Sequence, residues 1–372
     1  MLGTTLPTPL YGLYQEKFGF SQLMITVIFA TYAVGVIAAL LLFGRLSDEV
    51  GRRRVLLPGL VLSALSAVAF LLADGLAPLL IGRALSGLSA GIFTGTATAT
   101  LLDLAPPEGR GRATLIATIA NMGGLGCGPL LAGVVAEWSG SPLHLPFWID
   151  LALLVPAAIG IWALPEPVER KQHPRLRPQG PQVPAEIRAI FVRASLAAFA
   201  GFAVLGLFTA VAPAFLTHVI GVSSHAAVGL VVFSVFAASA AGQVSLGKFI
   251  AEERAMPFGC MALITGMALL AAGLASSSLT LLEAGGLVAG FGQGLSFRAG
   301  LATVNASAPA EQRAEVASSF FVVAYVAISI PVVGVGVLAE SAGLRTAGLV
   351  FAGVVAAIAA TALALLARDG DQ

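Results

Sequence analysis

Runs of about 20 apolar residues, separated by short groups of charged residues, proline and glycine, recur along almost the whole sequence. A run of this length forms a helix that crosses a bilayer, whose core has no water to satisfy irregular backbone. Charged residues make up only 10% of the chain, against about 25% in an average soluble domain. The sequence therefore predicts an all-α integral membrane protein. We predict eleven full spans, over residues 22–43, 54–74, 76–102, 112–136, 146–164, 191–217, 226–247, 257–276, 279–305, 315–339 and 344–367.

Residues 1–14 form one more apolar piece, which is too short to cross a bilayer. No basic segment precedes it, so it lacks the pattern of a cleaved signal peptide. We interpret it as a helix that has lost its first turns, which brings the expected number of membrane helices to twelve.

The one long polar stretch, residues 165–190, contains six prolines together with acidic and basic residues. Such a composition cannot bury itself, and we interpret it as a solvated linker. It divides the chain into an N-terminal six-helix bundle over 1–164 and a C-terminal six-helix bundle over 191–372.

Basic residues in short loops indicate the orientation, because loops rich in lysine and arginine stay in the cytoplasm. With the loop 43–54 on that side, alternate loops collect sixteen lysines and arginines, and the opposite loops hold only Lys17 and Arg345. We therefore expect a multi-pass protein of the plasma (cytoplasmic) membrane, with both termini and the central linker in the cytoplasm.

The two halves of the sequence match at a constant offset of 203 residues, without a gap over about 100 residues. For example, Pro106 and Arg110 align with Pro309 and Arg313. Two parallel six-helix halves, related by a pseudo-two-fold axis, are typical of transporters whose halves rock around a central site. The seventh span starts near Phe191, whose counterpart falls before Met1. We therefore expect that the natural protein begins further upstream or that this start is mis-assigned.

The loop between the first two full spans carries a specific motif. Its residues are Gly44, Asp48, Gly51, Arg52 and Arg53. The motif resembles the signature of the major facilitator superfamily in the loop between helices 2 and 3, and Glu49 departs from it, since a basic residue is usual there. The overall plan resembles the 12-helix drug:proton antiporters of that family, which perform multidrug efflux.

This resemblance implies a conformational latch in the loop. Asp48 would cap the N-terminus of a helix from the other half, and Arg52 would pair with Asp103 at the end of helix 4. The alternative is that the arginines simply anchor the loop in the cytoplasm.

Two membrane helices carry further family-like motifs. Arg83, in a glycine-rich part of helix 4, matches the family's helix-4 arginine, which implies proton coupling or substrate orientation. A structural pairing with a carbonyl or carboxylate is the alternative. Residues of helix 5 resemble the motif of exporters that exchange substrate for protons, although small residues at this spacing also serve close packing. The helix-5 residues are Gly124, Gly128, Pro129 and Gly133.

Ionisable residues within spans are functional candidates by default. Asp150, Glu283 and Arg298 are therefore candidates for proton coupling or substrate orientation. Asp150 and Glu283 could instead extend to the outer interface, and Arg298 to the cytoplasmic surface. Polar and aromatic candidates for a central cavity are Thr94, Thr96, Thr98, Asn121, Gln243, Gln293, Asn305 and Tyr325.

Several function classes are not indicated. The chain has 20 Lys+Arg and 19 Asp+Glu, and this balance gives no sign of nucleic-acid binding. No phosphate-binding Gly-Lys-Ser/Thr loop, metal-ligand cluster or nucleophile–base pair is evident. We therefore expect no enzyme activity, metal or cofactor, with the proton gradient as the driving force.

The predicted function is that of a secondary active transporter, most simply a monomer in membrane lipid, that exports drug-like or small organic compounds in exchange for protons. The mostly neutral spans argue against a highly charged substrate. Two alternatives stay open: an uptake symporter for a small organic solute and a non-transporting membrane sensor. A membrane enzyme acting on lipid would need a catalytic constellation at the membrane interface, and none is evident.

Overall fold

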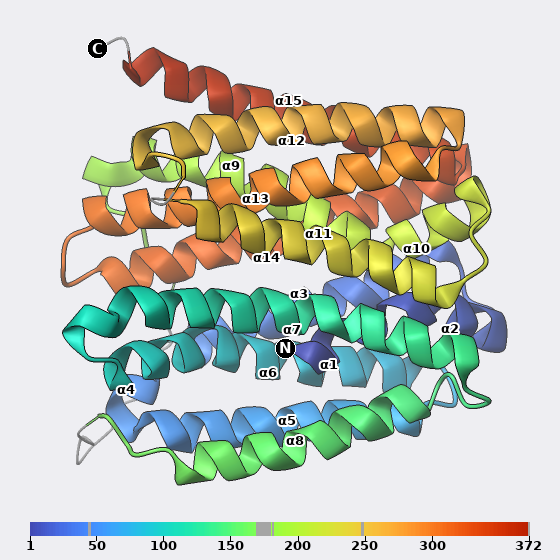
Figure 1. The fold of residues 1–372 in the computed structure, drawn as a ribbon, viewed down its shortest axis with the longest axis horizontal. Coiled ribbons are helices and arrows are strands. Elements are labelled where there is room, and N and C mark those ends of the chain that lie inside the picture. The colour runs from blue at the N-terminus through green and yellow to red at the C-terminus, as the bar shows by residue number, and fades with distance from the viewer. Residues whose placement is uncertain (44–45, 169–179, 181, 247–248, 371–372) are drawn as a thin grey trace.

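Long helices that run side by side form almost all of the described chain in the computed structural model (Figure 1). The structure describes residues 1–43, 46–168, 180, 182–246 and 249–370. The elements are α1 (Leu2–Thr5), η1 (Thr8–Leu10), α2 (Tyr11–Phe18), α3 (Gln22–Phe43), α4 (Leu46–Val50), α5 (Arg52–Leu71), α6 (Leu76–Leu104), η2 (Pro107–Gly109), α7 (Arg110–Trp138), α8 (Leu145–Ala163), η3 (Ala185–Ile187), α9 (Arg188–Ala210), α10 (Ala212–Ala214), η4 (Phe215–Ile220), α11 (His225–Ser245), α12 (Glu252–Ser276), α13 (Leu279–Ser307), α14 (Arg313–Ala342) and α15 (Leu344–Gly370).

Ten of the described helices are long and apolar enough to cross a membrane. α13 is not among these ten, although its 29 residues lie against α11 and α12. Glu283, Gln293 and Arg298 lower the mean hydropathy of this helix. The predicted span 279–305 therefore forms as a helix of spanning length that carries polar groups in its interior.

The first eighteen residues do not form one continuous helix. Pro7 and Pro9 divide them into α1, η1 and α2, because proline lacks the N–H that a helix interior needs. α1 packs on α6, α7 and α8, and the N-terminus lies midway along the bundle (Figure 1). The predicted first membrane helix is thus helical but broken, and the expectation of an upstream start stays a prediction.

The halves repeat in structure at the spacing that the sequence predicts. Adding 203 to the bounds of α6 gives the bounds of α13, and adding it to the first residue of α7 gives that of α14. Ser21 and Ser224, which are also 203 apart, each accept a hydrogen bond from the backbone N–H three residues on, before α3 and α11. The sequence repeat is therefore also a repeat of helices and of their caps.

The bundle has two ends. At the left in Figure 1, α3 ends and α5 begins, and we call this the Arg52 end. At the opposite end α7 terminates and α8 begins, and we call this the Glu137 end. The assignment of the Arg52 end to the cytoplasm stays a prediction.

Helices of the first half lie in the lower part of Figure 1 and those of the second half in the upper part. α7 packs against α11 and α3 packs against α14, and these two contacts across the halves are related by the repeat. The predicted boundaries at 164 and 191 stay a prediction. Residues 169–179 and 181 of the predicted linker lie outside the described residues, as does Gly44 of the loop motif.

Glycine allows the close contact between α7 and α11. A Cβ atom at Gly229 would lie 2.4 Å from the Pro129 carbonyl oxygen, and one at Gly133 would lie 2.4 Å from the His225 carbonyl oxygen. In the related pair, a Cβ atom at Gly336 of α14 would lie 2.4 Å from the Thr26 hydroxyl oxygen of α3. These approaches hold the two halves together toward the Glu137 end.

We predict that Gly229→Ala lowers the free energy of unfolding by about 1–3 kcal/mol, the usual range for overpacking, because the new methyl group would meet α7 backbone. Gly334→Ala in α14 is the matched control, since a Cβ atom there meets nothing within 4 Å. Thermal unfolding of the purified protein in detergent measures both variants. Equal unfolding temperatures for the two variants would contradict the close contact.

Candidate functional site

A cavity of about 560 Å³ lies at the centre of the bundle, between the helices of the two halves. Residues of α3, α6, α7, α9, α11, α13 and α14 line it. It extends from Tyr32, in the middle of α3, to Leu102 and Asn305, near the ends of α6 and α13. The glycine contacts lie toward the Glu137 end, whereas the cavity wall extends toward the Arg52 end.

Aromatic rings form much of the cavity wall. The ring centroids of Phe202 and Phe297 are 5.0 Å apart, and those of Phe202 and Tyr325 are 6.4 Å apart. The ring of Tyr32 lies 6.3 Å from that of Tyr325 and so links α3 of the first half to α14 of the second. Tyr325 lines the cavity, as the sequence predicts.

The predicted polar candidates divide into two groups. Thr94, Thr98, Asn121 and Asn305 line the cavity. The hydroxyl group of Thr94 also donates to the carbonyl oxygen of Ala90, one turn earlier, and this bond satisfies it within α6. Neutral polar groups therefore interrupt an otherwise apolar wall.

The structure places Gln243 and Gln293 between α11 and α13 rather than in the cavity wall. The hydroxyl group of Ser239 donates to Gln293 Oε1 at 2.5 Å, and Gln243 Nε2 donates to Ser239 Oγ at 3.4 Å. All three side chains are buried. They serve as hydrogen-bonded contacts between helices, since a buried amide needs partners within the protein. Periodicity alone could not tell which side of each helix faces the cavity.

Arg83 lies at the wall of the cavity and is 1% exposed. Its Nη1 donates to the Thr4 carbonyl oxygen at 2.5 Å. The guanidinium carbon lies 4.7 Å from the ring centroid of Tyr32 and 5.4 Å from that of Phe29, which are cation–π distances. Within the described part of the chain, Nε and Nη2 have no hydrogen-bond partner. The predicted carbonyl pairing is present, but it uses only part of the donor set.

Arg298 lines the cavity from α13, in the other half. Its Nη1 donates to the Gln243 carbonyl oxygen of α11, and its side chain is partly buried. The structure therefore places Arg298 at the cavity wall, the first of the two locations that the sequence allows.

Asp150 and Glu283 do not line the cavity. Asp150 is only 5% exposed, and a Cβ atom at Gly3 would lie 2.5 Å from its Oδ2, so the carboxylate packs on α1 rather than extending to the outer interface. Glu283 Oε1 accepts a hydrogen bond from the Ser234 hydroxyl at 2.5 Å, which joins α13 to α11. Any coupling role of these two acids is a prediction.

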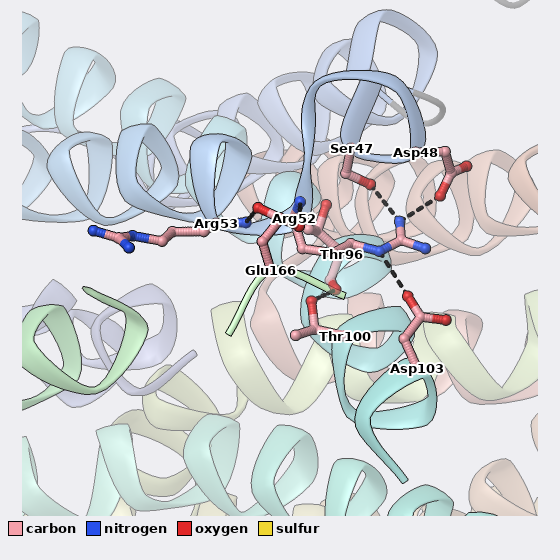
Figure 2. A network of polar contacts seen from close by, with 8 residues as sticks. All are labelled: Ser47, Asp48, Arg52, Arg53, Thr96, Thr100, Asp103 and Glu166. Atoms are coloured by element: carbon pink, nitrogen blue, oxygen red, sulfur yellow. Dashed lines mark hydrogen bonds and ion pairs between the residues drawn. The ribbon is translucent and has the colours of Figure 1, made fainter. Parts of the chain in front are cut away.

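A second polar cluster surrounds Arg52 at the start of α5 (Figure 2). Arg52 Nε lies 2.9 Å from Asp103 Oδ2, while Nη1 lies 2.5 Å from Asp48 Oδ1 and 2.7 Å from Ser47 Oγ. The predicted contact between Arg52 and Asp103 is present and ties the loop to the end of α6. Thr96, a predicted cavity residue, lies beside this cluster instead (Figure 2).

Sequence reasoning missed Glu166, which comes from the segment after α8. Its carboxylate accepts hydrogen bonds from the backbone N–H groups of Arg52 at 2.7 Å and Arg53 at 3.2 Å. These N–H groups open α5 and have no partner inside the helix, so the carboxylate caps it and complements the helix dipole. An acid directly after a helix on the Arg52 side was the available signal, but it stood in a stretch interpreted as a linker.

Gly51 allows this cap to form. Its φ is +104°, in a region that L side chains rarely adopt, and a Cβ atom there would lie 2.6 Å from Glu166 Oε2. Arg53 donates its backbone N–H to the same carboxylate and places its guanidinium 5.2 Å from the ring centroid of Trp162.

The predicted contact of Asp48 with a helix of the other half is not seen in this conformation. Within the described residues its ion pair is with Arg52, and its side chain is about half exposed. The latch role of the loop therefore stays a prediction.

The helix-5 motif lies in α7 and faces two neighbours. A Cβ atom at Gly128 would lie 2.4 Å from the Leu2 carbonyl oxygen, and one at Gly124 would lie 2.9 Å from the Met1 side chain, both in the first segment. Gly133 and Pro129 meet α11, as described above. The motif thus provides close packing on both sides of α7, and its exporter role stays a prediction.

Comparison with known proteins identifies the family. The family model of the Major Facilitator Superfamily matches residues 1–330. This chain is a member of that superfamily. Its family and fold are those of multi-pass membrane transporters rather than of enzymes. Among the described residues, no three histidine, cysteine, aspartate or glutamate side chains are arranged to hold a metal ion.

Individual relatives are distant. The chain is 30% identical to multidrug resistance protein 3 of Bacillus subtilis over 128 residues, which cover 33% of this chain and 24% of that protein. The matched part thus spans about a quarter of the relative's length.

Two solved structures share the fold. A bacterial homolog of the human lysosomal transporter Spinster has a TM-score of 0.74 at 18% identity and covers 99% of this chain and 95% of its own. A variant of the nucleoside transporter NupG has a TM-score of 0.70 at 14% identity, with 98% of each chain covered. These similarities confirm the predicted fold of two six-helix halves.

We predict that Glu166→Ala lowers the free energy of unfolding by about 1–2 kcal/mol, the cost of removing a helix cap, because two N–H groups of α5 lose their acceptor. Glu166→Gln retains one acceptor, so its free energy of unfolding falls between those of Glu166→Ala and the wild type. Glu186→Ala, which changes an exposed acid of the same polar stretch, is the control. Chemical unfolding in detergent distinguishes them, and equal stability of the two alanine variants would refute the cap.

Proposed function

We propose that this transporter works by alternating access and exports small organic compounds in exchange for protons. The observation that carries the proposal is the asymmetry of the bundle. A central cavity reaches the Arg52 end, while two repeat-related helix contacts hold the Glu137 end together. An arrangement of this kind exposes a central site to one side of the membrane at a time.

The orientation suggested by the basic loops makes this an inward-facing conformation. With the Arg52 end in the cytoplasm, the cavity loads from the cytoplasm, as an exporter requires. The corresponding outward-facing state would form when the contacts of α7 with α11 and of α3 with α14 separate at the Glu137 end. The glycines at these contacts offer no interlocking side chains, so the helices can part there.

Two observations support export rather than uptake. The helix-5 motif, which resembles that of antiporters, lies at the contact of α7 with α11, where rocking of the halves would act on it. In addition, one distant relative is named a multidrug resistance protein. The uptake symporter for a small organic solute stays the alternative.

The Arg52 cluster provides a latch for the cycle in this proposal. Asp48 lies in the loop that follows α3, and α3 packs against α14, whose N-terminus lies at the same end. When the Arg52 end closes, the half-exposed carboxylate of Asp48 would meet the N-terminus of α14 and its dipole. Arg52, held by Asp103, would keep the loop in place.

Proton coupling in this proposal falls to the acids of the membrane helices. Glu283 has one oxygen bonded to Ser234 and one, Oε2, that is buried without a partner among the described residues. Asp150 is buried beside α1. Arg83 and Arg298 would orient the substrate, because arginine keeps its proton at all physiological pH values.

We predict that full-length protein, expressed in cells that lack their own efflux pumps, lowers the accumulation of lipophilic dyes and antibiotics, and that a protonophore abolishes this effect. Arg52→Ala reduces the export rate about tenfold, corresponding to the loss of about 1.4 kcal/mol of charge-assisted hydrogen bonding. Asp48→Asn also reduces it, because the uncharged amide interacts more weakly with a helix dipole.

Arg54→Ala is the matched control, since this exposed arginine lies in the same loop. It leaves the export rate near that of the wild type, provided that all variants reach the membrane in equal amounts. Higher accumulation under a proton gradient would reverse the direction and favour the symporter. Unchanged accumulation of every compound would favour a sensor.

A further inference from the structure

The charged residues that line the central cavity are all of one sign. Arg83 and Arg298 line it, and no aspartate or glutamate does so among the described residues. The carboxylates of nearby helices are placed elsewhere: Asp150 packs on α1, Glu283 bonds Ser234, and Asp103 pairs with Arg52. The cavity therefore carries two positive charges without an acid in its wall.

Several N–H groups of Arg83 have no acceptor among the described residues. Of the five N–H groups of a guanidinium, the described residues provide an acceptor only at Nη1, from the Thr4 carbonyl oxygen. Nε and Nη2 are buried without a partner in the described part of the chain. A buried charged donor without an acceptor costs free energy, so an acceptor brought by a ligand would bind there favourably.

The surroundings of Arg83 favour an anion over a neutral acceptor. The rings of Tyr32 and Phe29 shield the guanidinium from water on their side, and Coulomb attraction is stronger in such a low-dielectric site. A planar guanidinium also matches the two oxygens of a carboxylate or phosphate. A cation placed in the same cavity would be repelled by both arginines.

The rest of the cavity wall suits an apolar body. Phe202, Phe297 and Tyr325 present clustered rings toward the cavity, and Leu205 and Leu301 add aliphatic surface. The cavity thus combines a cationic site at one part of its wall with an aromatic surface on the opposite half.

We infer that the transported substrate is an amphipathic oxyanion, with a carboxylate or similar group bound by Arg83 and an apolar body against the aromatic wall. This inference rests on the proposed function in one respect, that the central cavity is the transport site. A single negative charge agrees with the mostly neutral spans, which argue against a highly charged substrate. Lipophilic cations are disfavoured.

Binding of three matched dyes to the purified full-length protein in nanodiscs tests this inference. 6-(Dansylamino)hexanoic acid carries an anionic end, its methyl ester a neutral end, and dansylcadaverine a cationic end on the same dye. At pH 7.5 we expect the acid to bind at least tenfold more tightly than either of the others. Equal binding of the three dyes, tighter binding of the amine, or no binding of the acid would overturn the inference.

Substitutions of the two cavity arginines test whether the preference for the acid arises in the cavity. Arg83→Gln abolishes the preference for the acid and leaves the binding of the ester within about twofold of the wild type. Arg83→Lys retains the positive charge and therefore retains the preference at reduced affinity. Arg298→Gln, on the other half, weakens the binding of the acid to a smaller extent and provides a second test if Arg83→Gln does not fold.

Arg345→Gln is the control, because Arg345 bonds Ser277 at the exposed Glu137 end, and it leaves all three affinities unchanged. An unaltered preference in Arg83→Gln would refute the role of this arginine. The binding assay is independent of direction and coupling. Uptake of a bound acid would refute export alone, whereas export of cationic dyes without binding of the acid would refute this inference alone.

Discussion

Close backbone contact between the two halves is the interaction on which the rest of the structure depends. Gly133 and Gly229 bring α7 and α11 together, and Gly336 does the same for α14 against α3. Inside lipid there is no water, so the hydrophobic effect does not drive helices together. Their association depends instead on close van der Waals packing of small residues. These contacts lie toward the Glu137 end, and the central cavity lies between the halves with its wall extending toward the Arg52 end.

The second constraint is the placement of charge in a low-dielectric environment. Arg52 sits at the start of α5 and is held by Asp48 and Asp103, whereas Arg83 is buried within the bundle, where the Thr4 carbonyl oxygen is its one hydrogen-bond acceptor among the described residues. The first arrangement stabilises a loop between helices. The second leaves hydrogen-bonding capacity at a cavity wall, where a ligand can use it. Charges of the same kind thus stabilise a loop at the Arg52 end and, in our proposal, bind the substrate at the centre.

Much of the fold followed from the sequence. The apolar runs predicted the long helices, and the offset of 203 residues predicted that α13 would repeat α6. The pair of Arg52 with Asp103 followed from a family resemblance and is present. Individual cavity residues were harder to predict. Thr94, Asn121 and Asn305 line the cavity, but Gln293 accepts a hydrogen bond from Ser239 of α11, and Gln243 donates to the same Ser239. Uniformly apolar helices show little periodicity that would identify an inner face.

The sequence by itself determined that this chain is a bundle of membrane helices in two repeated halves, since apolar length and repeat spacing are local properties of the chain. Only the tertiary structure decided where the cavity lies between the halves, that Glu166 caps α5 from a segment more than 100 residues away, and that two donor nitrogens of Arg83 have no partner among the described residues. These features depend on which helix faces lie against one another. That is set by close packing at glycines and by the few buried polar contacts. The glycine spacing is visible in the sequence, but the helix that packs against each glycine is not.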